Sequence, residues 1–296
     1  MKILLFGANG QVGWELQRSL SPLGELIALS RHSTELCGDL ANLAGITNTI
    51  ANVRPDVIVN AAAYTAVDKA QTDRDAAQLI NATAPAAMAQ AASAVGAWLV
   101  HYSTDYVFDG SGVDPWKETD LPAPLSVYGK TKLEGEQLIQ ASGCKHLIFR
   151  TSWVYAARGG NFAKTMLRLA QERERLTVID DQVGAPTGAE LLADVTALAL
   201  RQVLLRPQDG GLYHLAAAGQ TSWNGYAKHV IDQAKIGQTA IKILANEVAA
   251  VPSSAFVTAA VRPLNSRLDT TKLQMIFGLQ LAPWQHGVER MLSEIL

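Results

Sequence analysis

Short apolar runs alternate with longer stretches of helical periodicity along the first half of the chain. The apolar runs predict β-strands at residues 2–6, 25–30, 56–60, 97–102 and 146–150. Apolar residues at helical spacing predict helices at residues 14–20, 40–53, 76–95 and 126–141. Strands that are apolar throughout are typical of a parallel sheet covered on both faces. The pattern therefore predicts an α/β fold with a Rossmann-type, doubly wound parallel sheet.

The pattern becomes less regular after residue 150. Helices are expected at residues 161–172, 189–205, 222–234 and 284–295, and short strands at residues 176–179, 211–215 and 241–244. Some of these elements must return to the first sheet. We therefore expect a first domain at residues 1–150 and a smaller, discontinuous α+β region within residues 151–296.

Composition and charge exclude several classes of protein. The 296 residues are 48% hydrophobic, which supports a sizeable core, and the net charge of −2 gives no reason to expect nucleic acid or an anionic membrane as a partner. The most apolar region, residues 84–100, is interrupted by Pro85, Gly96 and polar residues, so it is not a membrane span. The apolar stretch before Gly7 is too short for a secretory signal. Cys37 and Cys144 suggest a reducing compartment, and we expect the protein to be cytoplasmic.

A glycine-rich segment follows the first predicted strand. Gly7, Gly10 and Gly13 have the spacing G-x-x-G-x-x-G, and a predicted helix comes directly after them. Glycine lets the backbone approach a pyrophosphate, and a helix N-terminus offers free N–H groups and the positive end of a dipole. We therefore expect Gly7, Gly10, Gln11, Val12 and Gly13 to bind a dinucleotide.

A second motif carries acid–base chemistry. Tyr128 and Lys132 are four residues apart on one face of a predicted helix, and Thr104 lies 24 residues upstream of Tyr128, just after the strand predicted at residues 97–102. A nearby ammonium favours the phenolate and lowers the pKa of a tyrosine. A phenol tuned in this way suits proton transfer to a developing alkoxide. We expect Tyr128, Lys132 and Thr104 to be catalytic, with Tyr128 and Lys132 also touching the cofactor.

Positions at the carboxyl ends of the other strands should complete the cofactor site. Ser30 and Arg31 follow the second strand, where a hydroxyl suits the 2′-OH of NADH and a guanidinium suits the 2′-phosphate of NADPH. Asp39 could meet the adenine edge or cap the following helix. The remaining candidates for cofactor contact are Leu40, Ala62, Ala63, Tyr64, Thr65 and Tyr102.

Six segments together resemble one family. They are residues 60–70, 103–110, 128–132, 150–155, 181–187 and Arg262-Pro263, and they run in order over nearly the whole chain. In them the chain resembles the dTDP-4-dehydrorhamnose reductases, in the extended branch of the short-chain dehydrogenase/reductase superfamily. The resemblance implies reduction of the 4-keto group of dTDP-4-dehydro-L-rhamnose by NADPH or NADH, giving dTDP-L-rhamnose, a precursor of lipopolysaccharide and other cell-surface polysaccharides. It also implies a homodimer, with Mg²⁺ at the dimer interface in some members.

The substrate and the metal have their own candidates. Thr104, Asp105, Trp153 and Arg262 are expected to bind the sugar-nucleotide: an indole offers an apolar face to a 6-deoxy sugar, and a guanidinium matches a diphosphate. The spacing does not choose among the possible Mg²⁺ ligands, which are Glu15, Glu190, Glu289 and Glu294.

Two alternatives remain open, and a third is disfavoured. A dehydratase of this superfamily usually has Glu after the Thr-Asp pair, whereas Tyr106 stands here, so the carboxylate that dehydration needs is missing. An epimerase uses the same Tyr and Lys with a cofactor that never leaves. The regulatory subunit of methionine adenosyltransferase also resembles this family, and it binds nucleotide while serving a partner protein.

Overall fold

The computed structural model describes residues 1–237 and 241–296 and is built on one parallel sheet. Its six strands have the order β10-β5-β4-β3-β1-β2, and every neighbouring pair is parallel. This confirms the predicted fold class. The strands are β1 (Lys2–Phe6), β2 (Glu25–Leu29), β3 (Val57–Asn60), β4 (Trp98–Thr104), β5 (Lys145–Thr151) and β10 (Gly211–His214).

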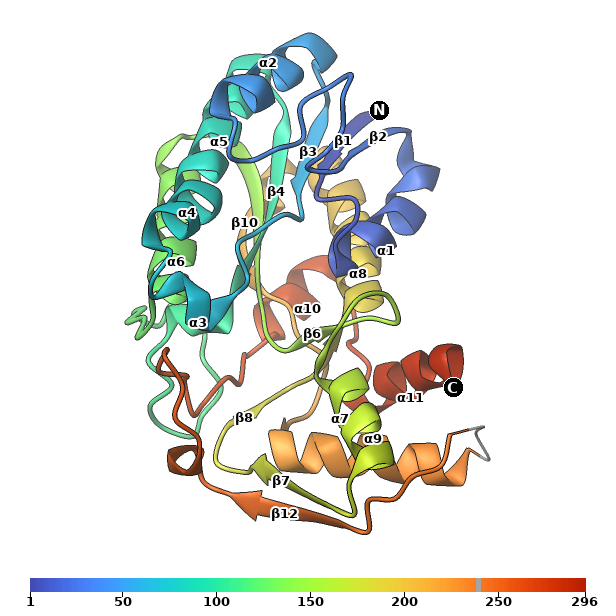
Figure 1. Cartoon of the computed structure of the whole chain (residues 1–296). Helices are drawn as coiled ribbons and strands as arrows, with labels where there is room; N and C mark the ends of the chain where they lie inside the picture. Colours follow the sequence, from blue (N-terminus) through green and yellow to red (C-terminus); the bar gives the residue numbers. More distant parts are fainter. Residues whose placement is uncertain (238–240) are drawn as a thin grey trace.

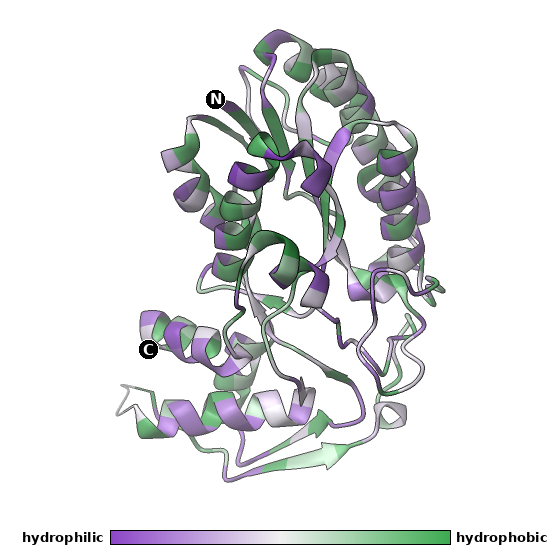
Figure 2. Cartoon of the chain, turned by 180° about the vertical axis from the view of Figure 1, so that it is seen from behind, coloured by the Kyte–Doolittle hydropathy of each residue, from purple (hydrophilic) through white to green (hydrophobic). Residues whose placement is uncertain are grey.

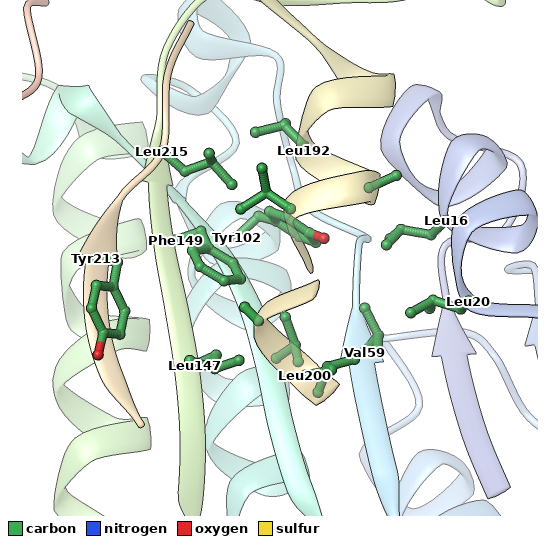
Figure 3. Close-up of a cluster of buried hydrophobic side chains, with 14 of the residues drawn as sticks. Leu16, Leu20, Val59, Tyr102, Leu147, Phe149, Leu192, Leu200, Tyr213 and Leu215 are labelled. Carbon is green, nitrogen blue, oxygen red and sulfur yellow. The ribbon is translucent and has the colours of Figure 1, made fainter. Parts of the chain in front are cut away.

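Helices cover both faces of this sheet (Figure 1). On one face, α1 (Gln11–Leu20) and α8 (Ala189–Leu205) bury Leu16, Leu20, Leu192 and Leu200 against the strands (Figure 3). On the other face, α2 (Leu43–Val53), α5 (Ala84–Val95) and α6 (Val127–Ala141) contribute a second cluster of buried side chains. Burial on both faces explains why the strands are apolar at nearly every position.

Three predicted helices have different limits in the structure. The first begins at Gln11 rather than at residue 14. α2 begins at Leu43 because Asn42 caps it: the side-chain oxygen of Asn42 accepts a hydrogen bond from the Gly45 N–H at 2.9 Å. The helix expected at residues 76–95 is divided into α4 (Arg74–Gln78), a π-helical turn η2 (Leu79–Thr83) and α5.

A smaller layer lies beyond the carboxyl ends of the large sheet (Figure 1). It contains α7 (Phe162–Glu172), α9 (Trp223–Ile236), α11 (Trp284–Ile295) and the parallel pair β7 (Arg175–Ile179) and β12 (Glu247–Val251). The strand predicted at residues 241–244 was wrong, since the strand begins at Glu247. Ile241 and Ile243 are apolar because they pack against the core of this layer, and the Leu244 N–H bonds to the Ala170 carbonyl.

Short elements complete the fold. α10 (Thr271–Phe277), which the sequence pattern did not predict, buries Leu273 and Phe277 in the core of the large sheet. The remaining elements are α3 (Val67–Ala70), η1 (Ser21–Leu23), η3 (Asp105–Val107), η4 (Pro207–Asp209), η5 (Ser253–Ala255), β6 (Val154–Tyr155), β8 (Val183–Gly184), β9 (Thr187–Gly188) and β11 (Thr221–Ser222). β10 and α8 follow residue 150 and still belong to the layers of the large sheet.

Hydropathy follows this layering. Apolar residues concentrate in the strands, and hydrophilic residues mark the outer surfaces of the helices (Figure 2). Among the residues that the structure describes, none of the helices combines the length and the apolar character needed to cross a membrane.

Candidate active site

A cleft of about 910 Å³ lies at the carboxyl ends of β1, β2, β3 and β4. From β1 the chain adds β2 on one side and then β3, β4 and β5 on the other, so the strand order reverses between β1 and β3. Open α/β sheets bind ligands at such a reversal. Most of the residues expected from the sequence line this cleft. They are Gly7, Gly10, Gln11, Val12, Ser30, Arg31, Asp39, Leu40, Ala62, Ala63, Tyr64, Thr65, Tyr102, Thr104, Asp105, Tyr128, Lys132 and Trp153.

The glycine-rich loop lies at the start of α1, and Gly10 is the N-cap residue. Gly7 has φ +87°, a left-handed conformation that glycine adopts without strain. Gly13 does not line the cleft but is buried beneath the loop. A Cβ at Gly13 would lie 2.1 Å from the Gly7 carbonyl oxygen, so its role is to let α1 approach the turn closely.

The positions after β2 carry paired charges. The Arg31 Nε lies 3.5 Å from Asp39 Oδ1, and the Arg31 side chain is 71% exposed. Asp39 does not cap α2, because Asn42 does. The Asp39 carboxylate therefore remains on the wall of the cleft, where it can accept hydrogen bonds as well as hold Arg31.

Thr104, Asp105 and Tyr128 meet at the end of β4. The Thr104 hydroxyl donates to Asp105 Oδ1 at 3.0 Å and accepts from the Tyr106 N–H at 3.1 Å. Burial raises the pKa of the Asp105 carboxyl to about 6, against the effect of hydrogen bonds from Ser266 and Thr104. The ring of Tyr106 packs edge-on against Tyr128, with 5.7 Å between centroids.

The electrostatics of Tyr128 differ from the expectation. Burial raises the pKa of the Tyr128 phenol to about 12, although a hydrogen bond with Thr104 lowers it. The Lys132 amine is not among the groups that lower the pKa of Tyr128 against the effect of burial. It is itself buried, which lowers its pKa to about 8, and it is held by the Tyr102 carbonyl at 2.6 Å and by His101 Nε2 at 3.1 Å. Both groups thus lie on one side of α6, but burial sets their proton affinities.

Trp153 forms part of the cleft wall on the side of the smaller layer. Its ring stacks on Trp223, with 3.7 Å between centroids and 12° between planes. Trp153 has φ +50°, which is unusual for a residue with a side chain. A Cβ at Gly184 would lie 2.9 Å from Trp153 Cε2, so the indole fits only because glycine stands there.

Arg262 lies outside the cleft lining and is already paired. Its Nη2 donates to Asp68 Oδ2 at 2.6 Å, and the Ala260 N–H donates to the other Asp68 oxygen at 3.0 Å. Asp68 belongs to α3, directly after the cleft-lining residues Thr65 and Val67, so this contact joins residues 260–262 to the segment that follows β3. The Asp68 pKa is lowered by hydrogen bonds from Arg262 and Ala260, against the effect of burial.

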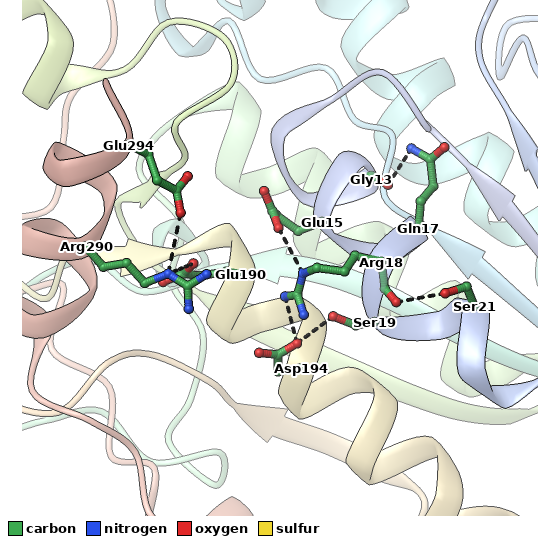
Figure 4. Close-up of polar contacts among 10 residues, drawn as sticks. All are labelled: Gly13, Glu15, Gln17, Arg18, Ser19, Ser21, Glu190, Asp194, Arg290 and Glu294. Carbon is green, nitrogen blue, oxygen red and sulfur yellow. Dashed lines mark hydrogen bonds and ion pairs between the residues drawn. The ribbon is translucent and has the colours of Figure 1, made fainter. Parts of the chain in front are cut away.

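The four glutamates expected to bind metal do not form one site. Glu190 and Glu294 both contact Arg290, at 3.2 Å and 3.5 Å, and Glu15 contacts Arg18 at 3.6 Å (Figure 4). Glu289 instead pairs with His229 at 3.3 Å. Within the described ranges, no group of three His, Cys, Asp or Glu side chains could hold a metal ion. The described part of one chain thus does not bring the four glutamates together as a set of metal ligands.

Several lining residues were not expected from the sequence. Trp223 begins α9, which lies far along the chain from the other lining residues, and no local sequence pattern identifies it as a residue of the cleft. Others lie within two residues of positions that were expected, so proximity along the chain was their only signal; they are Asn9, His32, Gly38, Ala61, Val67, Ser103, Tyr106, Thr151 and Val154. Ile80, Gly159 and Leu192 also line the cleft, and no expected cofactor or substrate residue lies near them along the chain.

The fold and the cleft place the chain in the extended branch of the short-chain dehydrogenase/reductase superfamily, among oxidoreductases that use a nicotinamide cofactor. Comparison with known proteins narrows this class. A family described as RmlD substrate binding domain matches residues 1–296. A dTDP-4-dehydrorhamnose reductase from Shigella flexneri is 60% identical over 100% of this chain and 98% of its own length, and one from Burkholderia thailandensis is 45% identical over 100% and 99%. The chain therefore belongs to the dTDP-4-dehydrorhamnose reductase family.

Solved structures agree with this assignment. A dTDP-4-dehydrorhamnose reductase from Clostridium acetobutylicum is 35% identical, covers 100% of this chain and 99% of its own, and has a TM-score of 0.90. One from Bacillus anthracis, solved in complex with NADP, is 35% identical, with 99% coverage of both chains and a TM-score of 0.87. UDP-glucose 4-epimerase from Thermus thermophilus shares the fold, with a TM-score of 0.80 at 19% identity.

Proposed function

We propose that this protein reduces the C4 keto group of dTDP-4-dehydro-L-rhamnose with a hydride from NADPH or NADH, giving dTDP-L-rhamnose. The observation that carries the proposal is the meeting of Thr104, Tyr128 and Lys132 in one cleft with the glycine-rich loop. Full-length identity of 60% to a reductase of that name supports the substrate. We place the reaction in the cytoplasm, which the two free cysteines favour.

In this proposal each catalytic side chain has one task. Tyr128 donates its proton to O4 as the hydride reaches C4, and Lys132 in its charged form favours the phenolate that remains. The Thr104 hydroxyl donates to Asp105 in the structure, so its hydrogen bond to O4 requires rotation of that hydroxyl. Asp105 would then accept from a sugar hydroxyl instead.

The nicotinamide nucleotide would lie along the cleft from Arg31 to Lys132. The N-terminus of α1 would meet the pyrophosphate, and the small side chains of residues 61–63 would let the cofactor pass close to the backbone. Arg31 would bind the 2′-phosphate of NADPH by leaving Asp39, whereas Asp39 and Ser30 would accept the 2′-OH of NADH. This arrangement supports use of both cofactors. The nicotinamide supplies the hydride.

The sugar-nucleotide would be held by residues of the smaller layer. Trp153, stacked on Trp223, presents an apolar face to the 6-deoxy sugar. We assign the diphosphate to Arg262, which would exchange its ion pair with Asp68 for phosphate oxygens. Tyr106 stands where a dehydratase carries Glu, so the site lacks that added carboxyl, and this favours a reductase over a dehydratase.

One assay separates the candidate functions. Purified protein is mixed with NADPH and a dTDP-4-keto-6-deoxy sugar, and the absorbance of the reduced nicotinamide is followed with the sugar product. A reductase oxidises one NADPH for each sugar reduced. Epimerised sugar without cofactor consumption would support an epimerase. No change in sugar or cofactor, despite NADPH binding, would support a regulatory module.

We also propose that the protein works as a homodimer. The face formed by α1, α8 and α11 carries Glu15, Glu190 and Glu294 beside Arg18 and Arg290 (Figure 4). Burial raises the pKa of Glu190, and Glu294 and Glu15 raise it further while Arg290 lowers it. A cation shared between two copies would need carboxylates from both. Light scattering with Mg²⁺ and with a chelator tests this: a monomer in both conditions would contradict the dimer, and a dimer in both would show that it needs no metal.

A further inference from the structure

A buried chain of three polar side chains lies behind the proposed catalytic lysine. Asn60 on β3 and His101 on β4 are register partners in the sheet, and Lys132 on α6 contacts His101. All three are at most 2% exposed. Asn60 Nδ2 lies 3.1 Å from His101 Nδ1, and His101 Nε2 lies 3.1 Å from Lys132 Nζ. The orientation of each group can be read from what its neighbours must donate or accept.

The backbone fixes the orientation of Asn60. The Ala62 N–H points at Asn60 Oδ1 at 3.1 Å, and only an oxygen can accept this bond. The amide nitrogen of Asn60 must therefore face His101 Nδ1. Because an amide NH₂ is a donor only, Nδ1 must supply a lone pair. A neutral imidazole with a lone pair on Nδ1 carries its proton on Nε2.

This tautomer has a consequence for Lys132. The His101 Nε2–H points at Lys132 Nζ, and an ammonium has three donors and no acceptor. The contact is satisfied when Lys132 is a neutral amine, which accepts from His101 and still donates to the Tyr102 carbonyl at 2.6 Å. With the ammonium, two donors face each other in a buried site, which costs free energy.

The surrounding charges agree with this arrangement. Burial lowers the pKa of Lys132 to about 8, and Glu136 alone among the described groups acting on it opposes the shift. Glu136 is itself held by Arg150 at 2.6 Å. Burial and the Lys132 charge hold the pKa of His101 well below its ordinary value, so the imidazole stays neutral. Other charged or titratable residues on α6 and the elements packed against it are Tyr128, Lys130, Glu134, Asp68, Lys69, Arg74, Asp75, Tyr102, Asp105, Tyr106, Lys145 and His146.

We propose that His101 is a positioning residue of the reaction, which stabilises the neutral amine of Lys132 through an Nε2–H that Asn60 imposes. The proposal rests on the function assigned above to Tyr128 and Lys132. After Tyr128 has given its proton to the substrate oxygen, an N–H bond of the Lys132 ammonium breaks, the proton passes through the cleft that both side chains line, and the O–H bond of Tyr128 forms again. No electrons change hands. The amine left behind is the form to which His101 donates, and it regains a proton through the cleft that Lys132 lines.

The tautomer can be measured without any assay of activity. In ¹⁵N-labelled protein, long-range ¹H–¹⁵N spectra distinguish protonated from unprotonated ring nitrogens, and His101→Gln identifies the signals of His101. We expect an unprotonated Nδ1 and a protonated Nε2 between pH 6 and about 9. A proton on Nδ1, or on both nitrogens, would overturn the proposal whether or not the protein proves to be a reductase.

The pH profile of kcat/KM gives the second measurement. In the wild type we expect activity to fall above pH of about 8 as Lys132 loses its charge. In His101→Gln and in Asn60→Asp, this fall should move upward by about one pH unit, a tenfold change in proton affinity. In Asn60→Asp a carboxylate oxygen would face Nδ1 and favour the other tautomer. His146→Gln, on the neighbouring strand and outside the chain of three, is the control. If kcat is lower in both variants but the pH profile of kcat/KM does not shift, His101 contributes only to packing and the proposal is overturned.

Discussion

The guanidinium of Arg262 and the carboxylate of Asp68 lie 2.6 Å apart across the boundary between the smaller layer and the large sheet. This ion pair ties the residue proposed to bind the diphosphate to Asp68 on α3, directly after the cleft-lining residues Thr65 and Val67. Binding of an anion by Arg262 must therefore compete with Asp68.

Substitution of Arg262 and of Asp68 distinguishes a role of Arg262 in binding the sugar-nucleotide from a structural role in holding residues 260–262. Arg262→Ala should raise the KM for the sugar-nucleotide by roughly 10- to 100-fold with little change in kcat, as expected for a charge-assisted bond made alike in ground and transition states. Asp68→Asn keeps the shape but frees Arg262, so the KM should stay level or fall. Steady-state kinetics measures both. An equal rise in the two variants would mean that Arg262 only braces residues 260–262.

Tyr128→Phe removes the proposed proton donor and little else. Because general acid catalysis contributes about 10²–10⁴-fold, kcat should fall on that order. NADPH binding, followed by fluorescence titration, should be nearly unchanged. Tyr213→Phe is the matched control, since Tyr213 is a buried tyrosine on β10 outside the cleft lining. Near-normal turnover by Tyr128→Phe would remove this residue from the mechanism.

Arg31→Ala tests the cofactor assignment. The variant should weaken NADPH selectively, by about 1–3 kcal/mol, because it loses a charge-assisted bond to the 2′-phosphate. NADH should bind nearly as before through Ser30 and Asp39. Dissociation constants for both cofactors decide the point, with Arg201→Ala on the exposed surface of α8 as the control. An equal loss of affinity for NADPH and for NADH would contradict the assignment of Arg31 to the 2′-phosphate.

The position of the Trp153 ring can be altered without removing it. A Cβ at Gly184 would lie 2.9 Å from Trp153 Cε2, so Gly184→Ala should displace the indole and lower kcat as Trp153→Ala does, through loss of sugar orientation. At Gly160 an added Cβ has open space around it, so Gly160→Ala should leave kcat unchanged. Wild-type kcat in Trp153→Ala would show that the ring does not orient the sugar.

The pair Glu136–Arg150 should matter for stability. Its side chains are 1% and 5% exposed, with Arg150 Nη2 2.6 Å from Glu136 Oε2. Glu136→Gln leaves a buried guanidinium without its counter-charge, so the free energy of unfolding should fall by about 3–5 kcal/mol. Glu172→Gln breaks an exposed pair with Arg168 and should cost about 0.5 kcal/mol or less. Urea denaturation of both variants provides the comparison, and similar small losses would refute the difference.

The parallel sheet and most of the residues that line the cleft can be predicted from the amino-acid sequence. Buried parallel strands must be apolar at nearly every position, and this pattern is visible locally in residues 2–6 and 56–60. Parallel strands bring their carboxyl ends to one edge. Gly7, Ser30 and Thr104 could therefore be placed at one edge of the sheet because the strands run parallel, and Tyr128 and Lys132 could be placed side by side from helical spacing.

The pairing of side chains that are distant along the chain depends on the folded arrangement and could not be predicted. Trp223 stacks on Trp153, Asp68 holds Arg262, and Arg290 lies between Glu190 and Glu294; no local pattern encodes such contacts, because they depend on where the two layers meet. The same reason explains the strand wrongly expected at residues 241–244, whose isoleucines are apolar for packing rather than for pairing. Burial, which depends on the whole fold, set the pKa values of Tyr128 and Lys132 against the expectation from their spacing.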